Sequence, residues 1–177
     1  MKRIIGIIFL LVFTSLAYSQ NDNFLTLPFE QEADIEITHA WYYGSKGDDC
    51  GLHLPKGAID YDAVAPGHTA TFKVLAAYDG VIHKNEWNSN GYGWLFAIKH
   101  TLPSGKIYYT MYAHLKEQPN TANYAVGMSI SRGEHFGWAG NTGTTNIHLH
   151  FEIREDIYND DNSIDPYDKH RQRDGYD

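Results

Sequence analysis

The amino-acid sequence predicts an all-β protein, and three observations lead to that prediction. Six β-rich runs follow one another between residues 34 and 153, separated by turns that contain glycine, proline or asparagine. No amphipathic helix longer than about ten residues is visible. Glycine and tyrosine are abundant, with 16 and 13 residues, and they are typical of turns and strands respectively. We therefore expect a mainly antiparallel sheet that forms a groove and resembles a β-sandwich.

Each predicted strand is defined by its own pattern. In DIEITHAW, residues 34–41, apolar and polar side chains alternate as in a half-buried strand. The segment LPSG, residues 102–105, lies between two β-rich runs and predicts a hairpin turn. The remaining runs are AIDYDAV (58–64), ATFKVLAAYDGVIHK (70–84), WLFAIKH (94–100), KIYYTMYAHL (106–115) and IHLHFEI (147–153).

Residues 1–19 are predicted to be a secretory signal peptide. Lys2 and Arg3 precede an apolar run, and small residues precede a cut before Gln20. The apolar run is short for a bilayer span, so an uncleaved membrane anchor is the alternative rather than the prediction. We expect an exported protein, periplasmic or extracellular, that has no stable membrane association after cleavage.

The rest of the chain is predicted to form one domain. Residues 20–33 are a loose lead-in, residues 34–167 the folded domain, and residues 168–177 a polar tail. The net charge is −8, and signal cleavage leaves about −10, which argues against nucleic acid and anionic lipid as partners. Cys50 is the single cysteine, so no internal disulfide is possible, and we interpret it as a free thiol.

Two histidines stand one residue apart in NIHLHFEIR, residues 146–154. In a strand, residues i and i+2 share a face, so His148 and His150 point the same way while Leu149 and Phe151 point toward a core. Two neighbouring imidazoles indicate a metal, or proton transfer beside a metal. The alternative is a solvated strand face that carries two histidines by chance.

A catalytic zinc site needs more ligands than this pair. Zinc in such sites takes three protein ligands and keeps one position for water. His53 and Asp60 lie in HLPKGAIDYD, where a loop leads into a strand. His114 lies in YAHL, where a strand meets a loop. These segments are the candidate sources of further ligands or of a general base.

With these motifs in order, residues 50–166 resemble the lysostaphin/LytM-type zinc endopeptidases, which cut peptidoglycan. The family pattern is a His followed by an Asp in a G-I-D-[FY]-like strand, then A-x-x-x-G-x-V, G-Y-G…H, Y-x-H-L and G-x-x-x-G-x-x-G-x-T-G…H-L-H-F-E. Five motifs in the same order are far more specific than one. This chain reads HLPKGAIDYD, LAAYDGVI, GYGWLFAIKH, YAHL and RGEHFGWAGNTGTTNIHLHFEI.

The resemblance implies roles for five residues. His53, Asp60 and His150 match the family's zinc ligands, and His114 and His148 match its catalytic pair. It also implies a duplicated hybrid motif fold, one Zn²⁺ per chain, and hydrolysis of stem peptides or cross-bridges of peptidoglycan. The oligomeric state stays open.

One departure from the family pattern leaves alternatives open. Six residues separate His53 from Asp60, whereas three are usual in the family. His39 is therefore a rival for His53, and Asp62, on the same strand face as Asp60, is a rival carboxylate. His100 is expected to have a structural role or to support a ligand.

Two other functions compete with the peptidase. One is a catalytically silent member of the same fold that acts as a regulator of the cell wall, which is disfavoured because all five matching residues are present. The other is a glycan-binding module that uses exposed aromatic side chains. Trp87, Tyr92, Trp94 and Trp138 are candidates to line a substrate groove, although aromatic residues of an all-β protein more often belong to the core.

Overall fold

The computed structural model describes residues 24–30, 33–40, 51–52, 58–65, 67, 69–156 and 163–164. These residues contain no helix, so none that could cross a membrane is found among them. The strands are β1 (Ile35–Ala40), β2 (Gly51–Leu52), β3 (Ala58–Ala63), β4 (Lys73–Leu75), β5 (Gly80–Asn88), β6 (Gly93–Thr101), β7 (Ile107–Leu115), β8 (Ser129–Ile130), β9 (His135–Trp138), β10 (Leu149–Glu155) and β11 (Ser163–Ile164).

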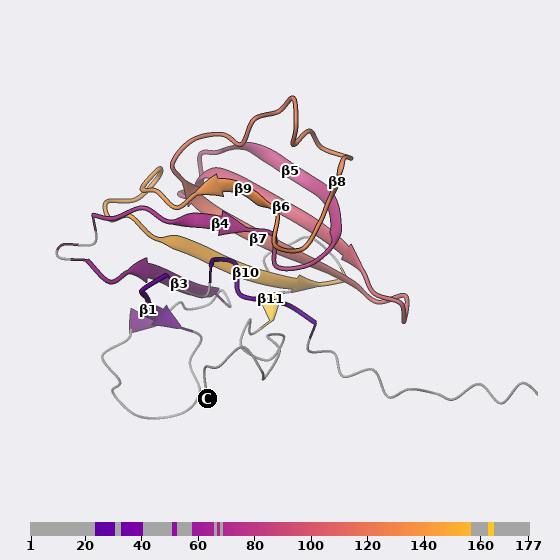
Figure 1. The fold of residues 1–177 in the computed structure, drawn as a ribbon, viewed down its shortest axis with the longest axis horizontal. Coiled ribbons are helices and arrows are strands. Elements are labelled where there is room, and N and C mark those ends of the chain that lie inside the picture. Colours follow the sequence, from indigo (N-terminus) through magenta and orange to yellow (C-terminus); the bar gives the residue numbers. More distant parts are fainter. Residues whose placement is uncertain are drawn as a thin grey trace, which may run out of the picture.

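Nine of the strands form one large sheet. Their order is β2-β1-β3-β10-β7-β6-β5-β8, and β11 pairs with β10 off this path (Figure 1). Only the short β1–β2 pair is parallel among the described pairings. The predicted fold class, all-β and mainly antiparallel, is therefore confirmed.

A second, two-stranded sheet of β4 and β9 packs against the large one. Phe136 of β9 stacks on Phe96 of β6, with ring centroids 4.2 Å apart, and it also contacts the ring of Tyr112 of β7. Val74 of β4 is fully buried in the same cluster. The hydrophobic core thus lies between two layers, as in an uneven β-sandwich.

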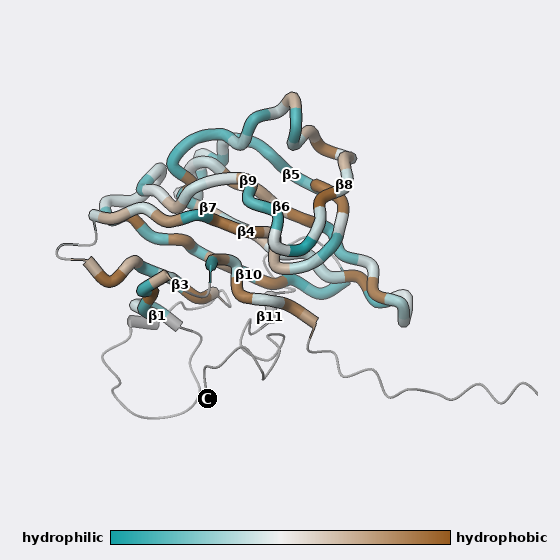
Figure 2. Tube along the Cα trace, viewed as in Figure 1, coloured by the Kyte–Doolittle hydropathy of each residue, from teal (hydrophilic) through white to brown (hydrophobic). Residues whose placement is uncertain are grey.

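The central strands are buried on both faces. Every residue of β7 after Ile107 is buried, and so is every residue of β10 before Glu155. Apolar and polar residues nevertheless alternate along β10, where Leu149, Phe151 and Ile153 enter the core (Figure 2). The opposite face of the strand therefore carries buried polar side chains, which need partners of their own.

The predicted hairpin at residues 102–105 is present between β6 and β7. The N–H of Gly105 donates to the carbonyl of Leu102 at 2.8 Å. Gly105 has a φ of 85°, a conformation that glycine adopts without a steric penalty.

The lead-in is not loose where the structure describes it, which corrects the prediction for residues 24–30. Phe24, Leu25 and Phe29 are buried in the main core, and Leu25 is fully inaccessible. The backbone follows the small sheet, since the N–H of Leu75 donates to Pro28 O at 2.8 Å. Burial of three large apolar side chains outweighs the polar composition of the segment.

Some of the predictions fall outside the described residues. They are the signal peptide, the free thiol of Cys50, the ligand His53 and the polar tail from residue 168.

Candidate metal and catalytic site

The candidate site is built on three neighbouring strands in the middle of the large sheet. β10 lies between β3 and β7, and the register places His150 opposite Asp60 on one side and opposite Ala113 on the other. His114 follows Ala113 directly, so side chains from three distant parts of the chain meet at one place. Residues opposite each other in antiparallel strands have side chains on the same face.

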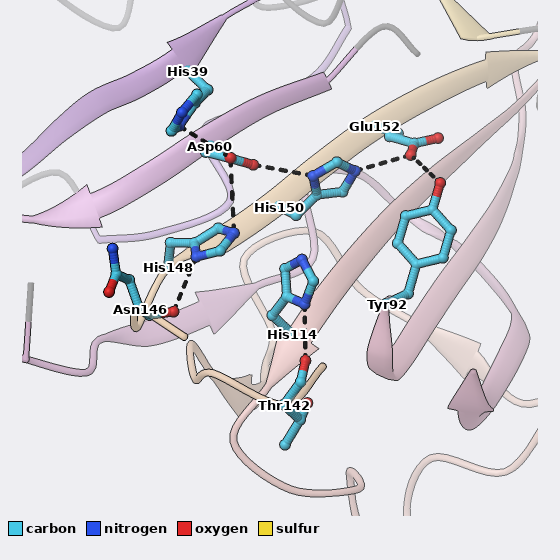
Figure 3. A network of polar contacts seen from close by, with 9 residues as sticks. All are labelled: His39, Asp60, Tyr92, His114, Thr142, Asn146, His148, His150 and Glu152. Carbon is cyan, nitrogen blue, oxygen red and sulfur yellow. Dashed lines mark hydrogen bonds and ion pairs between the residues drawn. The ribbon is translucent and has the colours of Figure 1, made fainter. Parts of the chain in front are cut away.

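The carboxylate of Asp60 is the meeting point of three imidazoles (Figure 3). Nδ1 of His150 lies 3.0 Å from Oδ1, and Nε2 of His148 lies 3.7 Å from Oδ2. Nδ1 of His39, on β1, lies 3.4 Å from Oδ2. Asp60 itself is buried, so these contacts form where solvent screens them poorly.

A second carboxylate holds the far side of the His150 ring. Nε2 of His150 lies 2.9 Å from Oε1 of Glu152, which also accepts a hydrogen bond from the hydroxyl of Tyr92 at 2.9 Å. Oε2 of Glu152 accepts two hydrogen bonds from the guanidinium of Arg154, at 2.7 and 3.0 Å. A carboxylate behind an imidazole fixes the ring orientation and raises its basicity as a metal ligand.

These contacts make the His150 position favourable for positive charge. Burial alone lowers the pKa of His150, but the hydrogen bonds and charges of Asp60 and Glu152 outweigh it and raise the pKa to about 9. Burial likewise raises the pKa of Glu152, but His150 and Arg154 outweigh that effect and lower it to about 2. Glu152 is therefore ionised under all ordinary conditions.

His114 is held in an unusual backbone conformation. Its φ is 58°, in the left-handed region that residues other than glycine rarely adopt. Its Nδ1 donates to the carbonyl of Thr142 at 2.8 Å, so the neutral ring carries its lone pair on Nε2. Burial lowers the pKa of His114 to about 4, so the ring is neutral near pH 7. Strained residues of this kind are concentrated at functional sites.

The backbone around His114 is held by contacts between two loops. The hydroxyl of Thr142 donates to Leu115 O at 2.7 Å and accepts from the N–H of Trp94 at 2.9 Å. Gly93 has a φ of 63°, and a Cβ there would collide with the backbone of Thr142. The glycines in the GYG and AGNTG segments therefore allow the loops to approach closely enough to hold His114.

His148 lies just before β10 and is oriented by its own loop. Its N–H donates to the carbonyl of Gly140 at 3.0 Å. Its Nδ1 donates to the carbonyl of Asn146 at 3.1 Å, which leaves the lone pair of the neutral ring on Nε2. The rings of His114 and His148 are 4.6 Å apart, and those of His114 and His150 are 5.7 Å apart.

The structure therefore brings four of the five predicted site residues together, namely Asp60, His114, His148 and His150. His53 is outside the described residues. The imidazoles of His39, His148 and His150 all contact the carboxylate of Asp60. This favours Asp60 over its rival Asp62 as the carboxylate ligand.

Sequence reasoning missed the two residues that support the site, Glu152 and Thr142. Glu152 was detectable, because it follows the two histidines of the H-x-H pair at the same spacing of two and so shares their strand face. The hydrogen bond of Thr142 comes from a loop and has no such pattern.

His100 has a structural role in the core. Its Nδ1 donates to the carbonyl of Asp79 at 2.9 Å, and its Nε2 lies 2.8 Å from the hydroxyl of Thr110. Burial lowers its pKa to about 4, so the ring is neutral near pH 7.

The donor set suits zinc. Among the described residues, no three or more His, Cys, Asp and Glu side chains are spaced as a complete metal cage. However, a carboxylate that faces imidazole nitrogens, with a second carboxylate behind His150, has the chemistry of a zinc centre with its supporting shell. Asp60 and His150 are the described residues best placed to be ligands.

Comparison with known proteins identifies the family of this chain. The sequence model of Peptidase family M23 matches residues 57–166, which include Asp60, His114, His148 and His150. The chain belongs to peptidase family M23. It is therefore a peptidase by family, and the residues that meet in the sheet lie within the matched segment. A comparison with curated protein sequences gave no significant match.

Solved structures of other M23 peptidases share the fold. The catalytic domain of the antimicrobial peptidase lysostaphin from Staphylococcus simulans is 24% identical over 76% of this chain and 90% of that domain, with a TM-score of 0.53. The chain spans 52% of a longer lysostaphin structure. The catalytic domain of the prophage-encoded M23 protein EnpA from Enterococcus faecalis, solved as a point mutant, is 21% identical over 81% of this chain and 95% of that one, with a TM-score of 0.57.

A third similar structure is a zinc-containing peptidase from Vibrio cholerae. It is 24% identical, with a TM-score of 0.52, and the match covers 78% of this chain and 39% of that one. At these identities the likeness establishes the lysostaphin-like fold.

Proposed function

We propose that this M23 peptidase is a zinc-dependent endopeptidase that hydrolyses peptide bonds in the stem peptides or cross-bridges of peptidoglycan. The observation that carries the proposal is the convergence of His148 and His150 on the buried carboxylate of Asp60, with His114 beside them. A zinc-containing relative and the peptidase lysostaphin are consistent with it.

Asp60 and His150 would hold the metal together with a third ligand, for which the sequence predicts His53. When bound, zinc acidifies a water molecule and polarises the scissile carbonyl. Glu152 keeps the His150 ring oriented through its contact with Nε2, so that Nδ1 faces Asp60.

His114 and His148 would divide the proton chemistry. His114 is neutral and presents Nε2, because its Nδ1 proton is held by Thr142 O, so it can take a proton from the attacking water and pass it to the leaving amine. His148 lies beside it, and with protons on both ring nitrogens it would keep Nδ1–H on Asn146 O and present Nε2–H to the developing oxyanion. Either group is expected to contribute roughly two to four orders of magnitude in rate.

A gel containing purified cell wall tests the proposal. The full chain is expected to clear the wall, and the clearing is expected to disappear with a chelator and with His148→Ala. His135→Ala, a change at an exposed histidine of β9, is the matched control and should clear normally. Retained zinc without any clearing by the parent would favour the silent regulator, and wall binding that ignores chelator would favour the glycan-binding module.

The proposed substrate also requires export. The sequence of residues 1–19 supports a signal peptide that is cleaved before Gln20. N-terminal sequencing of protein recovered from outside the cytoplasm should begin at Gln20, whereas recovery with Met1 intact would contradict cleavage.

A further inference from the structure

Two tryptophans form a cross-strand pair at the end of the β5–β6 hairpin. Trp87 of β5 lies directly opposite Trp94 of β6, so both side chains lie on the same face of the sheet. Their ring centroids are 5.3 Å apart, and the rings are nearly perpendicular, at 83°. Trp94 is partly buried and packs against the main core, whereas Trp87 is 53% exposed. The contact with an anchored partner therefore orients one large aromatic ring at the surface.

Stabilisation of the hairpin is the simplest explanation for this pair. Cross-strand aromatic pairs do stabilise antiparallel strands, and single exposed apolar side chains are common on protein surfaces. However, hairpin stabilisation requires only the contact between the two rings, and it leaves half of the Trp87 surface in water. Tryptophan that presents so much apolar surface is typical of binding interfaces, where a ligand covers the ring.

The pair lies next to the residues that hold His114. Trp94 pairs with Leu115, the residue that follows His114 on β7. The backbone N–H of Trp94 donates to Oγ1 of Thr142 at 2.9 Å, and the carbonyl of Thr142 accepts the hydrogen bond from Nδ1 of His114. A large substrate that reaches His114 can therefore also contact the tryptophan pair.

The residues around the pair favour a neutral ligand that carries hydroxyl groups. Residues 87–98 contain no Asp, Glu, Lys or Arg, so this segment offers no ion-pair partner to a charged peptide or a nucleic acid. Asn88 ends β5, and Asn90 is exposed in the turn that follows. Their amides can donate and accept hydrogen bonds. A pyranose ring has an apolar face of C–H groups and a polar rim, which fits an indole beside amides.

We propose that the Trp87–Trp94 pair is a sugar-binding subsite, on which an N-acetylated hexose of the peptidoglycan glycan strand stacks against the exposed ring of Trp87. This inference rests on the function proposed above, because the peptides that such an enzyme cuts are attached to glycan strands. The subsite holds the strand while its peptide occupies the site at His114. Trp94 positions the Trp87 ring, and the neighbouring amides bind the rim of the sugar.

Titration of the full-length protein with a soluble oligosaccharide of N-acetylglucosamine, which carries no peptide, tests the subsite. Binding is measured by calorimetry, because the variants change the tryptophan fluorescence. Trp87→Ala is expected to bind roughly tenfold more weakly, the scale of one lost aromatic contact. Trp87→Leu should bind equally weakly, because leucine is apolar but has no flat ring. Trp87→Tyr keeps an aromatic face and should bind within about threefold of the parent.

Two controls separate sugar binding from a structural role. Trp138→Ala removes another exposed tryptophan, on β9, and should bind the sugar as the parent does. Urea unfolding of each variant shows whether the hairpin contact matters for stability. A purely structural role predicts a lower urea midpoint for Trp87→Leu and an unchanged sugar affinity of the folded protein.

The outcomes distinguish this subsite from the proposed function. No binding of the oligosaccharide by the parent at millimolar concentration, or equal affinity of the parent and Trp87→Ala, overturns the subsite and leaves the peptidase function standing. An equal loss in Trp138→Ala also overturns the assignment to this pair. Binding of a sugar-free stem peptide that depends on Trp87, without such binding of the sugar, would make the pair a peptide-binding surface and overturn the subsite. Sugar binding that depends on Trp87 in a protein that clears no cell wall supports the subsite and contradicts the peptidase function.

Discussion

Glu152 offers a sharp test of how the site is supported. The change Glu152→Gln keeps the size of the side chain but replaces one carboxylate oxygen by an NH₂ group that can only donate. In the parent, Oε1 faces Tyr92 and His150, and Oε2 accepts both hydrogen bonds from Arg154. Neither orientation of the amide can replace all of these contacts.

The size of the effect follows from the burial of the group. Glu152 has no accessible surface, and the side chain of Arg154 is only 4% exposed. Removing one partner of such a buried pair leaves the other charge uncompensated, at a cost of about 3–5 kcal/mol in the free energy of unfolding. The His150 ring also loses the carboxylate that fixes its orientation, which is expected to weaken zinc binding about 10- to 100-fold.

Two measurements check this expectation. Urea unfolding of the metal-free protein gives the change in stability, and chelator competition gives the zinc dissociation constant. Tyr92→Phe is the matched control, because it removes only the hydroxyl that donates to Oε1 and should cost about 1–2 kcal/mol. A Gln variant with an unchanged unfolding midpoint and a zinc affinity within twofold of the parent would refute the reasoning.

Three further predictions concern other parts of the molecule. Alanine in a left-handed backbone conformation costs about 1–2 kcal/mol. Gly93→Ala should lower the free energy of unfolding by more than this, because its Cβ would also collide with the backbone of Thr142, whereas Gly91→Ala meets open space and should cost the backbone strain alone. Equal urea midpoints for the two variants would contradict this. Burial lowers the pKa of His100 in the folded protein from 6.5 to about 4, so as the pH falls the unfolded state binds the proton first. The free energy of unfolding should therefore decrease by about 3 kcal/mol as the pH falls from 6.5 toward 4. His100→Gln should show a smaller decrease in urea unfolding measured between pH 7 and 4.5. His114→Ala and His148→Ala should each lower kcat by about 10²- to 10⁴-fold while zinc content stays near one per chain, and loss of zinc would instead indicate ligands.

The sequence is most informative where a pattern has a fixed period. Alternation predicts the strand that carries His148 and His150, and places both on one face. The turn at residues 102–105 is recognisable from its own four residues. Asp60 and His114 are predicted from motif order, and the register of β3, β10 and β7 brings them together.

Other features depend on contacts that a linear sequence does not encode. The apolar residues Phe24, Leu25 and Phe29 belong to a segment of mixed, polar composition, and nothing local shows that the small sheet offers them a surface. The bulge at Thr38 is a property of the pairing between β1 and β3, so the position of His39 opposite Asp60 is not predictable from spacing. The left-handed conformation of His114 likewise results from tertiary contacts with the loop at Thr142.

The position of β10 in the sheet also determines when the protein can assemble. β10 inserts between β3 and β7, and its contact with Asp60 joins residues 90 positions apart in the chain. Until this strand has been synthesised, β1 is the one partner that β3 has in the large sheet among the described strands, and β7 exposes an open edge that can associate with other chains. Chains that end before residue 149 therefore carry two separate groups of strands, each with an edge that β10 covers in the complete sheet.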